Sequence, residues 1–586
     1  MKRSNRPPRA DESRLSGDSR KREVVETPLG RADSMAYPYA LKLHGKEMMA
    51  GFRALFAGLL LALALAGPAA AEWRRAESDR FIVYSQGSES VLRRYVRALE
   101  IYDYTLRRRM NLPIGEAPSR KLPIYLVSGR AGLAQINSRL GDNVAGQYFP
   151  VGEDIFAAAF SDSDQDYLLH EYFHHFSFEA GAANLPGWLV EGLAEYFMTA
   201  KVKEDSVDIG GFNENRVYWL FNASWLPLDK LLSKRPGEVG RNENRETYYP
   251  VAWLLTHYMM SDETRRAQLS AYIRDVEAGG DPVQAMERAT GMSLADLRRA
   301  LQRYRRITLT RYTLDFPEPQ ITVTTLPRSA DDLLLLGQRL KVGVAEDQRA
   351  ATAALIRRLA ARHPDDPFAM LQLGHAELHF GDPDAGEAVL TRLLEREPEN
   401  VEALQLMATR FSKLAEERPD ESIPLLARGR GYLARAFAVD ERNYYTLWLL
   451  ARTRQTARGY PNANDLTTWD LAYQAAPQLS GIRLGYASAM MQAGEFDGAI
   501  ALLGPLANSP HGGSAATAAQ TLLERARAGQ PPLGDDELEA AAEESALPAE
   551  PEPAPAPQDA PPPEDAPPED SAPQPSPAPE PVARPT

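Results

Sequence analysis

The sequence predicts an α+β domain, then an all-α repeat domain, then a disordered tail rich in proline and glutamate. Short apolar stretches typical of strands come first and long helical stretches follow, which is the order of an α+β domain. From residue 330 onward the pattern is helical and repetitive. From residue 529 onward, proline and acidic residues replace large apolar ones. The 586 residues allow three or four units of about 150 residues each.

The beginning of the chain has the parts of a secretory signal peptide. Within residues 1–71, a short charged stretch precedes the apolar run Ala54–Ala66, and small residues end at Ala71. The run is shorter than the roughly 20 apolar residues of a membrane anchor. We therefore expect cleavage after Ala71 and export to the periplasm or the medium, with no stable membrane anchor. Met48 or Met49 is the alternative start of the chain, which leaves open whether residues 1–47 are translated.

Charge and proline are unevenly distributed. The formal net charge is −14, to which residues 1–71 contribute +5 and residues 531–586 contribute −13. The latter stretch also holds 18 of the 45 prolines and cannot bury enough apolar surface to fold. We expect a disordered acidic tail over 529–586. The remaining chain is only mildly acidic, which argues against a nucleic-acid binder. The absence of cysteine excludes disulfides and thiolate metal sites.

Residues 72–316 combine strands and helices. The apolar patterns are those of buried strands and amphipathic helices. Pro123 indicates either the start of its strand or an edge strand. We expect strands over 81–84, 121–127, 147–150 and 154–160, and helices over 91–110, 131–140 and 164–178.

The second half of the chain has a helical repeat. Pro364 and Pro398 lie 34 residues apart, and Pro477 and Pro510 lie 33 apart, each pair framing a Gly-Asp or Gly-Glu turn between apolar helical stretches. This resembles tetratricopeptide repeats (TPR), whose period is 34 residues. The resemblance implies a TPR-like solenoid over 350–528, after a linker and first helix over 317–349. Such a solenoid is a docking platform for a peptide or protein, or else a domain that packs on the first one and binds nothing.

His170-Glu171-Tyr172-Phe173-His174 carries the clearest chemistry of the sequence. Residues four apart share one face of a helix, so His170 and His174 can direct two imidazoles at one ion. This is the H-E-x-x-H arrangement of zinc peptidases, in which the glutamate is the general base toward a metal-activated water. The alternative is a helix with incidental surface histidines.

A catalytic zinc site usually has three protein ligands. The segment Pro186–Phe197 reads as a loop followed by a helix, in which Glu191 and Glu195 lie four residues apart. We assign Glu191 as the third ligand. Glu195 is placed to accept a hydrogen bond from a ligand histidine and fix its tautomer; the alternative is an exposed helical residue.

H-E-x-x-H followed by W-L-x-E-G-L-A-E-Y resembles the gluzincin zinc metallopeptidases, in particular the peptidase MA-like family. The resemblance covers roughly 75–310 and implies a zincin-like domain with one Zn²⁺ per chain. It implies His170, His174 and Glu191 as zinc ligands and Glu171 as general base. It also implies that Asp154–Phe160 is an edge strand that pairs with an extended substrate.

Gluzincins also use a Tyr or His as donor to the developing oxyanion. The stretch Thr247–Trp253 is similar to the corresponding part of peptidase MA-like proteins, and this similarity implies Tyr249, with Tyr248 as the fallback. The alternative is that both tyrosines are structural. We expect His257 to lie in the core or against a partner, and His175 to lie off the metal-binding face.

Two classes of function follow. The first is an exported zinc-dependent peptidase, a hydrolase that docks a substrate or partner on its repeats. The second is a catalytically inactive or structural zincin-fold envelope protein that acts as a TPR scaffold for protein–protein interactions. The substrate, endo- or exopeptidase character and oligomeric state are left open.

Overall fold

The computed structural model describes residues 72–534, except 116–117, 141–143, 162–164, 182–183, 305–306, 308 and 314. The predicted signal peptide and nearly all of the predicted acidic tail therefore lie outside the described residues, and all described residues belong to one compact unit. The helices within this part of the chain are too short or too polar to cross a bilayer.

A six-stranded sheet organises the first domain, in the order β4-β5-β3-β2-β1-β9. Strands β2, β3 and β5 are parallel, whereas β1, β4 and β9 are antiparallel to their neighbours. The strands are β1 (Arg74–Glu77), β2 (Phe81–Ser85), β3 (Leu122–Val127), β4 (Gly146–Val151), β5 (Asp154–Phe160) and β9 (Thr322–Thr325). The segment predicted as a linker thus contributes a strand of this sheet.

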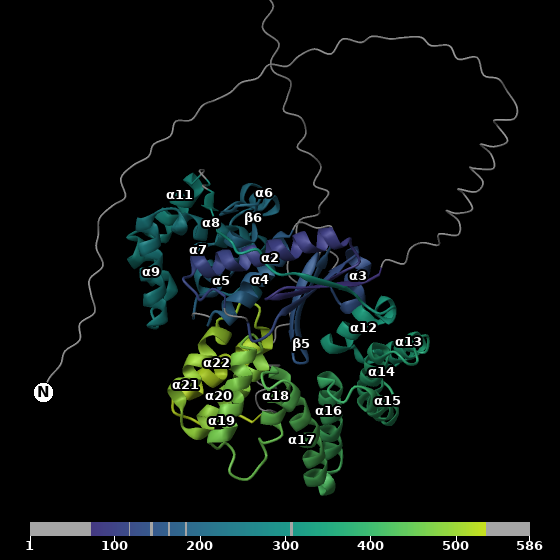
Figure 1. Ribbon diagram of the computed structural model, residues 1–586. Coiled ribbons are helices and arrows are strands. Elements are labelled where there is room, and N and C mark those ends of the chain that lie inside the picture. The colour runs from purple at the N-terminus through teal and green to yellow at the C-terminus, as the bar shows by residue number, and fades with distance from the viewer. Residues whose placement is uncertain are drawn as a thin grey trace, which may run out of the picture. The chain divides into compact units, whose positions relative to one another are not determined.

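Helices cover both faces of the sheet (Figure 1). Alternate strand residues point to opposite faces, so Ile124 and Leu126 pack toward α2 (Glu89–Arg109) while Tyr125 and Val127 pack on the other side. The central strands are apolar on both sides because each side is covered by helices. Helices α3 (Gly129–Ile136) and α12 (Ser329–Val342) lie side by side on the second face.

The expected edge strand is a wrong prediction. Asp154–Phe160 forms β5, which pairs with β3 on one side and with β4 on the other, so its residues are buried. The edge of the sheet is β4, because a tight turn at Gly152 returns the chain antiparallel to β5. Pro123 lies near the start of β3, an interior strand, so of its two predicted positions the strand start is confirmed and the edge is not.

The helices that follow the sheet carry the predicted motifs. Helix α4 (Asp166–Glu179) corresponds to the predicted 164–178, and residues 162–164 lie outside the described part. Helix α5 (Gly187–Met198) packs against both α4 and α8 (Tyr248–Met260). A second apolar core joins α5 and α8 to α7 (Leu228–Ser233), α9 (Glu263–Glu277), α10 (Pro282–Thr290) and α11 (Leu294–Arg303). The small sheet β6 (Lys201–Val202), β7 (Ser206–Ile209), β8 (Thr310–Thr313) and helix α6 (Glu214–Asn222) complete this domain.

Residues 349–527 fold into helices that stack pairwise (green to yellow in Figure 1). Asp and Asn side chains cap several of these helices by accepting hydrogen bonds from their first turns, for example Asp366 from Ala369 and Asn400 from Ala403. The helices are α13 (Arg349–Ala360), α14 (Pro367–Phe380), α15 (Pro383–Arg396), α16 (Val401–Glu417), α17 (Ser422–Val439), α18 (Tyr444–Arg452), α19 (Ala463–Ala475), α20 (Ser480–Ala493), α21 (Phe496–Ala507) and α22 (Gly513–Arg527). The all-α part of the predicted fold class is therefore observed.

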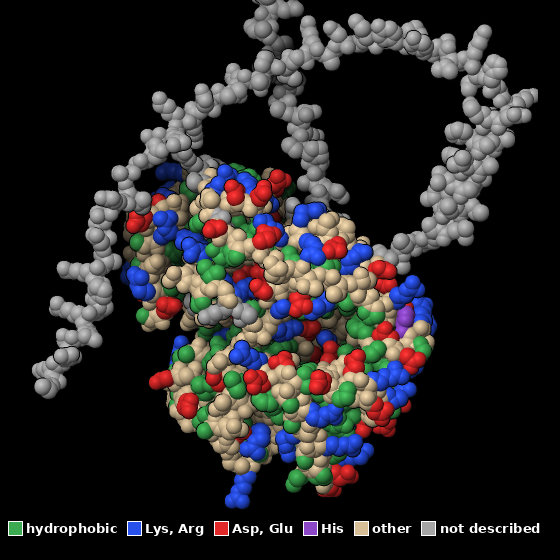
Figure 2. Space-filling view, in the orientation of Figure 1, with side chains coloured by type: hydrophobic (Ala, Val, Ile, Leu, Met, Phe, Trp, Pro, Cys, Tyr) green, Lys and Arg blue, Asp and Glu red, His purple; other side chains and the backbone are tan. Residues whose placement is uncertain are grey.

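Charged side chains of both signs are interspersed over the face shown in Figure 2, without a broad area of one sign. This agrees with the mild net charge predicted for the folded part and offers no extended basic surface on that face.

Substitution of Gly192 tests the close packing of α5 on α8. A Cβ atom at Gly192 would lie 2.8 Å from the backbone oxygen of Ala252, which cannot move without shifting α8. We expect Gly192→Ala to lower the free energy of unfolding by about 1–3 kcal/mol, measured by denaturant unfolding. Gly431→Ala is the matched control, since it lies in helix α17 with open space around it and should stabilise slightly. Equal effects of the two substitutions would contradict this packing.

Candidate metal centre

Three of the predicted ligands converge in the interior. His170 and His174 lie on one face of α4, and their Nε2 atoms are 3.1 Å apart. Glu191, on α5, places Oε2 3.4 Å from His170 Nε2 and 3.5 Å from His174 Nε2. The two histidines are 7% exposed and Glu191 is fully buried. A tetrahedral zinc ion with Zn–N bonds of 2.0–2.1 Å separates its ligand atoms by about 3.3 Å, so these donors fit such an ion.

A fourth donor comes from the repeat domain. His511, in the loop between α21 and α22, places Nε2 2.8 Å from Oε1 of Glu191. Its ring packs edge-on against His174 with centroids 5.0 Å apart. The donor atoms of His170, His174, Glu191 and His511 all lie within 4.8 Å of one another. Catalytic zinc sites keep one position for water, whereas four protein donors close a site. The arrangement with His511 in place is therefore a closed one.

His511 has no sequence signal of a metal ligand. It is a single histidine in the loop Ser509-Pro510-His511-Gly512, and nothing in its neighbourhood has a metal-ligand spacing. Only the docking of the last repeat brings it to the centre: Asn508 Nδ2 donates to Asn184 Oδ1 at 2.7 Å, and Arg235 donates to the backbone oxygen of Ala507 at 3.3 Å.

The charge of Glu191 is the electrostatic centre of the cluster. Burial by itself would raise the pKa of Glu191, but the imidazoles of His511, His174 and His170 outweigh it and hold the pKa well below its usual range. Burial lowers the pKa of His174 to about 4, so this ring is neutral at pH 7. Burial would lower the pKa of His170 as well, but Glu191 and Glu195 raise it well above its usual range, so a metal bound here would displace a proton from His170.

Glu195 lies behind the cluster, where the sequence predicted it. Its Oε1 is 3.4 Å from Nδ1 of His170, on the side of the ring away from Glu191. Arg216, on α6, holds the same carboxylate with two hydrogen bonds of 2.8 and 2.7 Å. Burial would raise the pKa of Glu195, and Arg216 with His170 lowers it to about 2. The alternative of an exposed residue is wrong, because Glu195 is 1% exposed.

The two tyrosine candidates separate clearly. Tyr248 is fully buried and its hydroxyl donates to the backbone oxygen of Lys234 at 2.9 Å, so it is committed to structure. Tyr249 lies at the cluster, with its ring centroid 6.3 Å from that of His170. The guanidinium of Arg216 stacks over the Tyr249 ring at 5.0 Å. Tyr249 is therefore the tyrosine at the cluster, and the Tyr248 hydroxyl is bound to the Lys234 backbone instead.

Glu171, His175 and His257 lie outside the set of four donors. Glu171 is half-buried on α4. Burial raises the pKa of Tyr148, on the edge strand β4, well above its usual range, and the negative charge of Glu171 adds to this rise. His175 shares a 2.8 Å hydrogen bond with Tyr148 and stays outside the ligand set, as expected. His257 is a core residue that contacts the Tyr304 hydroxyl at 2.8 Å and the Gly210 oxygen at 3.1 Å.

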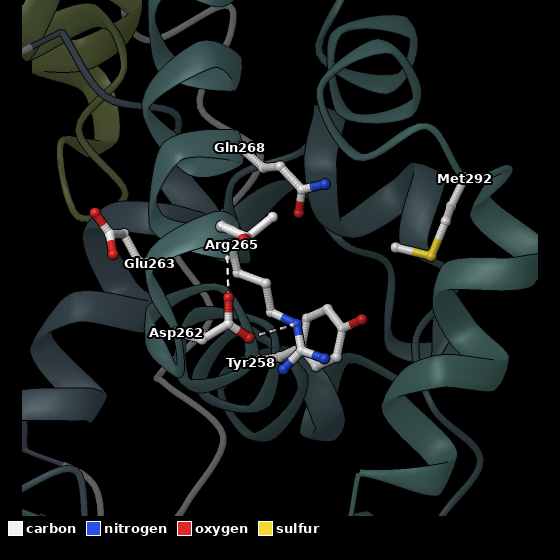
Figure 3. Close-up of a pocket in the computed structure, with 7 residues that line it drawn as sticks. Tyr258, Asp262, Glu263, Arg265, Gln268 and Met292 are labelled. Carbon is white, nitrogen blue, oxygen red and sulfur yellow. Dashed lines mark hydrogen bonds and ion pairs between the residues drawn. The ribbon is translucent and has the colours of Figure 1, made fainter.

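A separate hollow lies between α9 and the loop after α10 (Figure 3). Asp262 there caps α9 by accepting from the Arg265 backbone at 2.9 Å, and the Arg265 guanidinium stacks on the Tyr258 ring at 3.9 Å. Its main charged groups already pair with one another, and it shares no residue with the imidazole cluster.

Comparison with known proteins supports the repeat domain. The family model of the tetratricopeptide repeat matches residues 367–410, which span α14, α15 and the first part of α16. The predicted TPR-like character is thus confirmed for this stretch, and it indicates a role in protein–protein interaction. A search of curated proteins finds no significant match to the chain.

Glu195→Gln tests how the predicted ligand His170 is held. A neutral amide keeps the shape of Glu195 but weakens the contact that orients His170, so we expect zinc affinity to fall about 10–100-fold. Chelator competition measures the affinity. Asp208→Asn is the matched control, since Asp208 is also buried and accepts two bonds from Arg311 at 2.6 and 2.8 Å, outside the cluster. Unchanged zinc affinity in Glu195→Gln would contradict the assigned role.

Proposed function

We propose that the chain is a zinc-dependent peptidase that its own last helical repeat holds in a closed state. The observation that carries this proposal is the convergence of the buried His170, His174 and Glu191 with the exposed His511. Three of these donors come from the first domain and fit an open catalytic site, and His511 comes from the repeat domain and closes it.

The residues around the cluster have complementary roles in peptide hydrolysis. A zinc ion bound here supplies Lewis acidity toward water and the substrate carbonyl. Glu171 takes the proton from the attacking water and returns it to the amine as the C–N bond breaks. Tyr249 donates a hydrogen bond to the developing oxyanion. Glu195 and Arg216 keep His170 oriented with Nε2 toward the cluster.

The edge strand β4 is the surface on which an extended peptide would bind. Within the described sheet it pairs with β5 on one side, which leaves the backbone groups of its other side for a substrate strand. Tyr148 on β4 contacts His175 of α4, and it lies close enough to Glu171 for the glutamate charge to raise the pKa of its hydroxyl. A peptide added to β4 would therefore run past the general base.

Glu171→Gln tests the peptidase reaction. Without a carboxylate to accept the proton of water, we expect hydrolysis of a broad peptide library to fall about 10²–10⁴-fold, with as much zinc bound as in the native chain. Cleavage is followed by mass spectrometry and zinc by elemental analysis. Full activity in Glu171→Gln would show that this residue is not the base. Absence of zinc from the cluster would refute the metal-dependent mechanism altogether.

His511→Ala tests the closed state. Nε2 of His511 pairs with Oε1 of the buried Glu191 at 2.8 Å, and we take about 1.5–3 kcal/mol for this contact, the range for interactions with a charged group. Its loss should shift the population toward the open site and raise the hydrolysis rate about 10–100-fold. His363→Ala is the matched control, because His363 is another imidazole of the repeat domain that pairs with a carboxylate, Asp332 at 3.3 Å. An unchanged rate in His511→Ala would remove the closing role.

The second candidate function is a scaffold for protein–protein interaction. The tetratricopeptide match over 367–410 favours it, and a closed set of four donors is also the arrangement of a structural zinc site. The same variants separate the two functions. Zinc bound by the native chain and by His511→Ala, with no cleavage by either across broad libraries, favours the scaffold.

A further inference from the structure

We propose that Glu153, His375 and His379 form a second metal site, for a divalent cation of the zinc type, at the junction of the first domain and the repeats. This site is independent of the cluster around Glu191 and of the proposed peptidase activity. The donor atoms of its three side chains all lie within 4.8 Å of one another.

The histidine pair repeats the geometry of the first centre. His375 and His379 are four residues apart on α14 and face one way, as His170 and His174 do on α4. Their ring centroids are 5.1 Å apart with an interplanar angle of 73°, against 4.8 Å and 76° for His170 and His174. Two imidazoles in this relation can coordinate one ion.

The carboxylate comes from the other domain. Glu153 lies in the turn between β4 and β5 and places Oε2 3.2 Å from Nε2 of His375. This distance is close to the roughly 3.3 Å between ligand atoms on a tetrahedral zinc ion. Tyr444 of α18 holds the turn in place, since its hydroxyl donates to the Gly152 backbone oxygen at 3.2 Å.

Polar atoms without hydrogen bonds point to a ligand. His375 is 1% exposed; its Nδ1 makes no hydrogen bond with a described residue, and its Nε2 has the 3.2 Å contact with Glu153 without hydrogen-bond geometry. Nε2 of His379 is likewise buried without a hydrogen bond to a described residue. Buried polar groups are nearly always satisfied, so such nitrogens require an explanation. A cation bound between them and Glu153 supplies it.

The surrounding charges allow a cation. Two ammonium groups act on the site, that of Lys413 on His379 and that of Lys341 on Glu153. Lys341, on α12, is 3.5 Å from Asp154 and 3.0 Å from Glu402. Its charge is therefore balanced by two carboxylates other than Glu153. Two imidazoles and one carboxylate are a donor set that zinc accepts, with the fourth position left for water.

A metal at this site would join the two domains. It would tie the β4–β5 turn to α14, a helix of the matched tetratricopeptide stretch. The part of the repeat surface that α14 presents here is thus occupied by the first domain. The site would also restrain the edge strand β4 at its end.

Zinc stoichiometry tests the site on the full chain. We expect the native chain to bind two zinc ions, and His375→Ala/His379→Ala and His170→Ala/His174→Ala to bind one each, by elemental analysis after dialysis against zinc. Zinc should also raise the melting temperature of His170→Ala/His174→Ala, because a ligand that binds only the folded state stabilises it. His363→Ala, a histidine variant outside both clusters, should bind as many ions as the native chain.

The zinc contents of Glu153→Gln and of His170→Ala/His174→Ala test the site further. Glu153→Gln preserves side-chain size and should lose the same ion. It replaces the double histidine variant in the test if that variant fails to fold. The His170→Ala/His174→Ala chain keeps the proposed site intact, so absence of zinc from it, with native circular dichroism, overturns the proposal. Equal zinc content in the native chain and His375→Ala/His379→Ala overturns it as well.

Discussion

The fully buried carboxylate of Glu191 is the constraint on which the candidate centre depends. A buried anion is strongly destabilising unless cations or hydrogen-bond donors compensate it. Here the compensation comes from three imidazoles, two on α4 and one on the loop between α21 and α22. The first domain and the last repeat therefore both contribute imidazoles that compensate the charge of Glu191. A bound zinc ion would compensate the same charge more strongly, with the same donors.

Helix packing makes this arrangement possible. Gly192, next to Glu191, allows α5 to approach the Ala252 backbone of α8 closely. This approach places Glu191 and Glu195 toward α4, and Tyr249 at the start of α8 beside His170. Arg216 then joins these groups, because it binds Glu195 and stacks on Tyr249. One close helix contact thus positions a ligand, its supporting carboxylate and the candidate oxyanion donor together.

The two histidine clusters are built in the same way. In each, a helix presents two imidazoles four residues apart, and a charged or ligating group arrives from the other domain. His511 reaches the first domain from the repeats, and Glu153 reaches the repeats from the first domain. Under our proposals, metal occupancy and the association of the two domains are therefore linked. Opening the catalytic site then means moving the last repeat, while the β4–β5 turn stays attached at α14.

Local pattern was sufficient for much of this protein. Four strands, the helix of His170 and His174, the helix of Glu191, and the repeat confirmed at 367–410 all follow from apolar periodicity and spacing, because these depend on neighbours in the chain. What remained undetermined depends on contacts between distant segments. The position of β4 at the edge, Tyr248 turning to the Lys234 backbone, and the arrival of His511 at Glu191 were decided by tertiary structure alone. A single loop histidine has no periodicity, and its role arises only when folding brings it to a buried charge.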